Sequence, residues 1–347
     1  MKNEIEDNRI LSANNLLIKQ DLQKLIYLNN YICSFSEKDI SVLYLMFMRF
    51  NNFILYEILE YIKNKYNVDY IKELEYKKQI SKMRSKLKCN LSNIDNIDKI
   101  NDEMNEMFMK MNNPLIMNLY PNLCDNFGIF FYNGSCIGNN FEISMLMKSI
   151  IYTDKTIDHE KTFNYSVEIG KIFSVLCKVF DLDNKIKVDS KNSKNFISSK
   201  DYNLFKYKND KELSQIIFYY NKIGILNFYK NLIFVNLKEI NSLNIKLKYV
   251  ICKNTMDEMQ EICSDFKLNS KFSFFSNIDF RNFMYHYSFP TKFNNIQYEK
   301  TLFGVCEEIL AINEIDIDCY LNECIEILIS YFSEKIENSK YKFLGSI

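Results

Sequence analysis

Residues 279–290 read Asp-Phe-Arg-Asn-Phe-Met-Tyr-His-Tyr-Ser-Phe-Pro, and in this stretch three chemically useful side chains stand on an apolar, aromatic frame. His286 follows Arg281 by five positions, and Asn282 comes directly after the arginine. Both arginine and histidine are scarce here, because the 347 residues include two histidines and four arginines. We therefore predict that this stretch forms the functional helix and that the rest of the chain is a helical scaffold around it.

These residue types suit the cleavage of RNA. Histidine holds or releases a proton near neutral pH, so His286 is a candidate general base or acid. The guanidinium of Arg281 offers a fixed fork of donors that matches phosphate oxygens and stays charged, and Asn282 is a candidate orienting residue. A 2′-hydroxyl nucleophile would explain a preference for RNA over DNA.

The stretch is predicted to form one short helix. Asn277 or Asp279 would cap its N-terminus, and Pro290 limits it to about three turns. At about 3.6 residues per turn, positions 282 and 286 share a face, whereas Arg281 and His286 lie about 140° apart. Either the arginine reaches around the helix or a second copy of the chain completes the site, and this geometry favours the second copy.

The pattern Arg-Asn-x-x-x-His at Arg281–His286 resembles the signature of HEPN-superfamily ribonucleases. The resemblance implies an all-α fold and metal-independent cleavage of RNA at a site shared by two HEPN domains, usually in a homodimer. It makes Arg281, Asn282 and His286 the catalytic residues and implies no cofactor or metal. Such proteins occur in toxin–antitoxin, abortive-infection and CRISPR-linked defence systems, so an antitoxin or another defence protein is the implied partner.

Four further residues are candidates for binding the RNA. Tyr285 and Tyr287 belong to the aromatic frame of the motif. Lys194 and Lys200 lie in residues 182–210, a long, polar, lysine-rich segment that is predicted to be a mobile loop over the bound RNA.

Two other functions compete with the nuclease. An arginine and a histidine on a half-exposed helix also fit an ordinary solvated surface, and a helical adaptor that keeps the HEPN frame without catalysis is the alternative. A nucleotide-sensing CRISPR effector is disfavoured, because the N-terminal part lacks the strand–helix alternation and glycine turns of a doubly wound domain.

Composition predicts a cytoplasmic globular protein. Apolar residues make up 47% and charged residues 25% of the chain, as is usual for such proteins. The net charge is zero, so only local basic segments, residues 72–88 and 185–211, point to nucleic acid, while residues 307–337 are acidic. Ten cysteines without a Cys-x-x-Cys pair argue against a zinc site and against a disulfide framework. The apolar runs 40–50 and 216–237 are interpreted as buried helices, because the first is too short to cross a membrane and polar residues interrupt the second.

The expected fold class is all-α, or mainly α: a multi-helix bundle with one short β-hairpin near residues 128–138. Glycine (7) and proline (3) are scarce, which favours long helices. We expect a helical region over 1–112, a connector with the hairpin over 113–140, and a HEPN-like helical bundle over 141–347.

Several local expectations can be checked directly. Ser36 is predicted to cap a helix that runs to Asn67, and Asn133-Gly134 to form the hairpin turn. The periodicity of residues 240–252 does not decide between strand and helix, and Thr255 is predicted to cap a following helix. The charged residues 154–160 are interpreted as a capped turn, with a metal site as the less favoured alternative.

Overall fold

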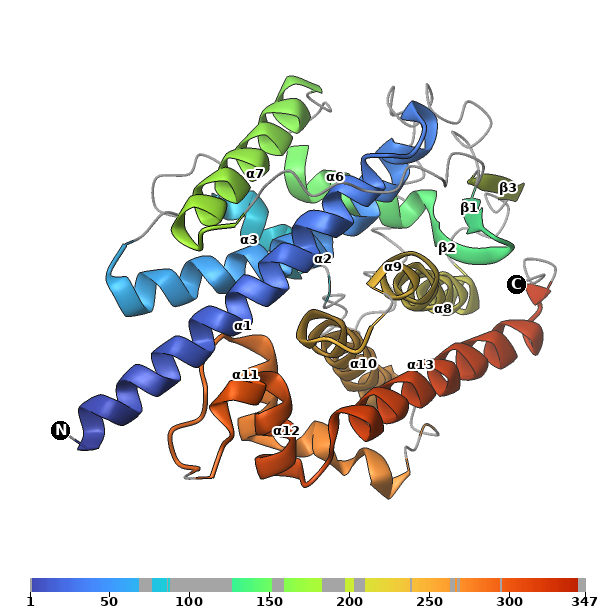
Figure 1. The fold of residues 1–347 in the computed structure, drawn as a ribbon. Helices are drawn as coiled ribbons and strands as arrows, with labels where there is room; N and C mark the ends of the chain where they lie inside the picture. Colours follow the sequence, from blue (N-terminus) through green and yellow to red (C-terminus); the bar gives the residue numbers. More distant parts are fainter. Residues whose placement is uncertain are drawn as a thin grey trace.

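Helix α10 (Ser242–Ile262), whose N-terminal half is buried on all sides, lies at the centre of a mainly α-helical protein (Figure 1). It packs against α1 (Lys2–Ile32), α8 (Lys211–Phe228), α11 (Ile278–Tyr285) and α13 (Glu314–Glu337). Because residues 242–252 are all buried, this half of the helix has no amphipathic period, which is why residues 240–252 gave no clear prediction. The expected helix start at Thr255 is wrong, since α10 continues through that residue.

The protein is seen here in a computed structural model, and its mainly α fold agrees with the fold class expected from the sequence. The structure describes residues 2–68, 77–85, 87, 127–151, 159–182, 197–202, 210–237, 239–262, 266, 269–293 and 295–342. Residues 88–112 of the expected helical region, most of the basic segment 185–211 and the charged residues 154–158 lie outside these ranges. Smaller elements complete the described part: η4 (Tyr229–Phe234), α9 (Val235–Leu237), η5 (Ser270–Ser276), η6 (Tyr298–Lys300) and α12 (Leu302–Leu310).

Helix α2 (Glu37–Tyr66) begins and ends where the sequence predicted. The side chain of Ser36 accepts a hydrogen bond from the backbone N–H of Asp39, and Asn67 ends the helix in the left-handed conformation with φ of 55°. Its segment Val42–Tyr66 is long and apolar enough to cross a membrane by length and composition, and 89% of the most apolar 18 residues within it are buried in the protein. In this structure α2 is therefore a core helix.

A small sheet covers one side of the bundle. β1 (Phe127–Tyr132) and β2 (Ser135–Asn139) form the predicted antiparallel hairpin, with positive φ at both turn residues, Asn133 and Gly134. The edge strand β3 (Ser198–Tyr202) pairs antiparallel with β1 and was not predicted. Its residues are polar and mostly exposed, so it lacks the apolar alternation that identifies a half-buried strand.

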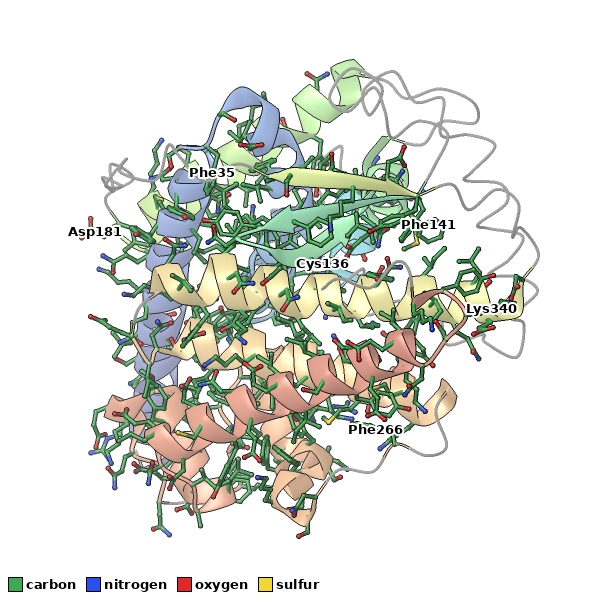
Figure 2. The ribbon with its side chains drawn as sticks, turned by 90° about the vertical axis from the view of Figure 1, so that its right-hand side faces the viewer. Phe35, Cys136, Phe141, Asp181, Phe266 and Lys340 are labelled. Atoms are coloured by element: carbon green, nitrogen blue, oxygen red, sulfur yellow. The ribbon has the colours of Figure 1, made fainter. Side chains whose placement is uncertain are left out.

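Segments far apart in the sequence share one core. Buried side chains form a single cluster that runs from Ala13 to Tyr341. α2 packs against α3 (Lys77–Ser85) and α6 (Asn140–Ile151), which is followed by α7 (His159–Val179). The sheet, α8 and α13 then stack in succession, and Figure 2 shows Cys136 of the sheet above this pair of helices.

The contact between α8 and β2 depends on two glycines. A Cβ atom placed on Gly224 of α8 would lie 2.8 Å from the Cα atom of Gly138 in β2. Gly138 itself has φ of 156°, next to an irregularity in the pairing of β1 with β2. The helix can therefore approach the strand this closely only while position 224 has no side chain.

We predict that Gly224→Ala lowers the free energy of unfolding by about 1–3 kcal/mol, because the methyl group meets backbone atoms that cannot move aside easily. Urea denaturation followed by circular dichroism measures this change. The matched control is Gly170→Ala in α7, where a Cβ atom would have no neighbour within 4 Å. That variant should gain up to about 1 kcal/mol from the higher helix propensity of alanine. Equal effects of the two variants would contradict the close-packing argument.

Candidate functional site

The motif stretch borders a solvent-open groove of about 870 Å³. The groove lies between the N-terminal half of α1, the C-terminal half of α2, and α11 with the segment that follows it. Asn277 begins α11 as predicted, because its side chain accepts a hydrogen bond from the backbone N–H of Phe280 at 3.0 Å. Asn282 and His286 both line the groove.

His286 lies just beyond the end of α11, not on it. Its backbone N–H donates to the carbonyl of Asn282 at 2.9 Å, and its φ and ψ of −128° and 155° are extended. The helical geometry assumed for His286 from the sequence is therefore wrong. The extended backbone turns the imidazole away from the helix axis and into the groove, where 55% of the side chain is exposed.

A buried carboxylate holds this histidine. Nδ1 of His286 lies 2.7 Å from Oε2 of Glu57 on α2, whose side chain is only 2% exposed. The other oxygen of Glu57 pairs with the guanidinium of Arg84 on α3. The Arg84 guanidinium also lies 4.6 Å from the centre of the Tyr56 ring. This cation–π contact helps to hold the guanidinium next to the carboxylate of Glu57.

Sequence reasoning missed Glu57, although a signal was present. Glu57 follows Ile54, Leu55 and Tyr56 and precedes Ile58, in the second half of the helix that was predicted to run to Asn67. A charged residue at such a position needs a partner, because an unpaired charge is costly to bury. That rule marks Glu57 as unusual, but it does not identify His286, which is 229 positions away.

The structure does not bring Arg281 into the groove. Its side chain is exposed, and Nη2 donates to Oδ1 of the neighbouring Asn282 at 3.4 Å. Among the described residues Arg281 makes no ion pair, and it is not one of the residues that line the groove. One chain thus presents His286 and Asn282 on the groove and the Arg281 guanidinium outside it.

The two candidate tyrosines have partners inside the protein. Tyr287 is 1% exposed, its hydroxyl donates to Oδ2 of Asp21 at 2.8 Å, and it has no open ring face for stacking on a base. Tyr285 is half-buried, and its hydroxyl donates to Oδ1 of Asn254 at 2.5 Å. Burial raises the pKa of both tyrosines, so both hydroxyls stay protonated donors.

The structure places Lys200 far from the motif stretch. Lys200 lies on β3, exposed, with Nζ 5.4 Å from the centre of the Phe131 ring. Figures 1 and 2 place β3 and α11 at opposite ends of the molecule. Lys194 lies outside the described residues. The only lysines that line the groove in the described part of the chain are Lys65 and Lys292.

A buried ionic network lies beneath the groove. Asp21 of α1 accepts hydrogen bonds from Tyr287 and Ser242, and Nζ of Lys246 in α10 lies 3.3 Å from its Oδ2. The same ammonium lies 3.3 Å from the centre of the Tyr287 ring. Burial lowers the pKa of Lys246, and the negative charge of Asp21 opposes that shift. The network therefore fastens the segment after α11 to the core.

Comparison of the chain with protein-family models, with curated proteins and with solved structures found no match. Within the described ranges, no group of three His, Cys, Asp or Glu side chains is placed to hold a metal ion.

We predict that Asp21→Asn lowers the free energy of unfolding by about 3–5 kcal/mol, because it leaves the buried Lys246 without its counter-charge. Urea denaturation measures the loss. The control is Lys24→Ala in the same helix, which removes a surface pair with Nζ 3.8 Å from Oε2 of Glu239. That change should cost less than about 1 kcal/mol. An Asp21→Asn effect no larger than the control would show that the network contributes little.

Proposed function

We propose that the groove beside α11 is the active site of a metal-independent endoribonuclease of the HEPN type, acting in the cytoplasm as a toxin or antiphage-defence effector. The observation that carries the proposal is the imidazole of His286, which is 55% exposed in the groove and anchored by the buried Glu57. An exposed base held in one orientation is what proton transfer to or from a substrate requires.

The proposed reaction needs a base and an anchored phosphate. His286 takes the proton of a ribose 2′-hydroxyl, and the 2′-oxygen attacks the neighbouring phosphorus. The bond from phosphorus to the 5′-oxygen breaks, the leaving oxygen takes a proton from water, and the hydroxide formed takes back the proton that His286 had accepted. The products are a 2′,3′-cyclic phosphate and a free 5′-hydroxyl, so DNA, which lacks the nucleophile, is not cut.

The guanidinium for this reaction is proposed to come from a second copy of the chain. Arg281 is exposed beside the groove but does not line it, which fits a residue that serves the site of a partner subunit in a homodimer. Asn282 lines the groove and accepts a hydrogen bond from Arg281, so it lies between the groove and the guanidinium. A defence-system partner protein, such as an antitoxin, would control access.

The test is cleavage of labelled RNA by the purified chain in EDTA. We expect the wild type to cut RNA and to leave DNA of the same sequence intact, and His286→Ala to lose at least about 100-fold in rate, because a general base contributes about 10²–10⁴-fold. The control is His159→Ala, which removes the other histidine of the sequence and should keep the wild-type rate.

Mixing two inactive variants tests the shared site. Arg281→Ala and His286→Ala should each be inactive, but a mixture of the two should recover about a quarter of the wild-type rate, since half of the dimers would be mixed and each would hold one intact site of two. No recovery on mixing would place Arg281 and His286 in the same subunit's site.

A non-catalytic adaptor is the second candidate function, and the position of Arg281 outside the groove favours it. Lack of RNA cleavage by the wild type, with or without divalent metal ions, would support the adaptor and reject the nuclease.

A further inference from the structure

We infer that Glu57 is a positioning residue: its buried carboxylate fixes the ring proton of His286 on Nδ1 and leaves Nε2 bare to face the substrate. The inference deepens the proposed function, because it names the nitrogen that acts and the group that selects it. Its role in cleavage rests on that proposed function, whereas the choice of nitrogen follows from the contacts alone.

The argument starts from what each atom can do. A carboxylate accepts hydrogen bonds and does not donate them, so the nitrogen 2.7 Å from Oε2 of Glu57 must be the one that carries a proton. In a neutral imidazole one nitrogen is a donor and the other an acceptor. Fixing the proton on Nδ1 therefore leaves a lone pair on Nε2, and a lone pair is what a general base needs.

Arg84 pairs with the oxygen of the Glu57 carboxylate that does not face His286. Its guanidinium only donates, and it pairs with Oε1 of Glu57 while His286 faces Oε2. The side chain of Arg84 is 29% exposed and that of Glu57 is 2% exposed, so the carboxylate is enclosed, with the guanidinium paired to one oxygen and the imidazole next to the other. The arrangement allows one proton position on the neutral ring.

A purely structural link between α2 and the segment after α11 would use the same contact, so the test must detect the position of the proton. The sequence makes this practical, because it has two histidines. Nitrogen-15 NMR of the full chain, labelled at histidine, distinguishes the two neutral ring forms, and His159→Gln assigns the signals of His286. In the neutral ring of the wild type, we expect the proton of His286 on Nδ1.

Glu57→Gln should reverse the assignment. Arg84 would hold the amide oxygen, which turns the amide NH₂ toward His286 and makes Nδ1 an acceptor, so the ring proton moves to Nε2. In the double variant Glu57→Gln with Arg84→Ala, the amide is free to turn its oxygen to the ring, and the proton should return to Nδ1. The control, Glu60→Gln, removes another carboxylate of the groove and should leave the His286 signals unchanged.

Two results would overturn the inference. One is a wild-type ring with its proton on Nε2, a result that requires no change at Glu57. The other is a folded Glu57→Gln protein whose His286 keeps the wild-type ring form.

Cleavage separates this inference from the proposed function. If the wild type cuts RNA, Glu57→Gln should lower kcat by at least about 100-fold with little change in KM, as happens when a catalytic histidine is held in the wrong ring form. Cleavage by Glu57→Gln at the wild-type rate would overturn the role of Glu57. If no chain cuts RNA but the ring forms are as expected, Glu57 still positions His286 and the nuclease proposal fails.

Discussion

The structure depends on a helix, α10, whose N-terminal half is buried on every side and yet carries two lysines. In α10, Lys246 lies 3.3 Å from Asp21 of α1, and Lys248 lies 2.5 Å from Asp318 of α13. A buried ammonium without a partner is far costlier than a missing apolar contact, so each lysine requires a carboxylate from a particular neighbouring helix. Apolar packing alone permits helices to slide and rotate, whereas these two pairs specify which faces of α1 and α13 meet α10.

The same constraint places the candidate site. Asp21 also accepts the hydroxyl of Tyr287, the residue directly after His286. The core pair with Lys246 therefore holds the backbone next to the histidine, and Glu57 then holds the ring itself. Helix α2 makes a second ion pair, between Arg49 and Glu142 of α6. It differs from the pair of Glu57 and His286 because neither of its side chains is more than 3% exposed. Of these two carboxylate pairs on α2, one is closed within the core and the other opens onto a groove.

The sequence predicted those features that neighbouring residues determine. Ser36 and Asn277 cap helices because a side-chain oxygen reaches a backbone N–H within one turn, and Asn133-Gly134 reverses a hairpin because both residues tolerate positive φ. β3 was missed because a polar edge strand is stabilised by its partner's backbone and not by an apolar pattern. In the groove, His286 and Asn282 were predicted, but the burial of Tyr287 and the position of Arg281 depend on helices distant in the sequence.

The spacing of the motif now has a physical interpretation. His286 follows Asn282 by four positions, which is the span of the last helical hydrogen bond, and the backbone N–H of His286 makes that bond to the carbonyl of Asn282. The extended ψ of His286 then ends the helix and directs the ring toward Glu57. Arg281, one residue before Asn282, stays on the helix and points elsewhere. A histidine one position earlier would remain within the helix, and one position later it would occupy the place of Tyr287, which the pair of Asp21 and Lys246 holds in the core. With five positions between Arg281 and His286, the histidine stands directly after the end of the helix. There its ring can reach a buried carboxylate, and the next residue, Tyr287, can bind to the core.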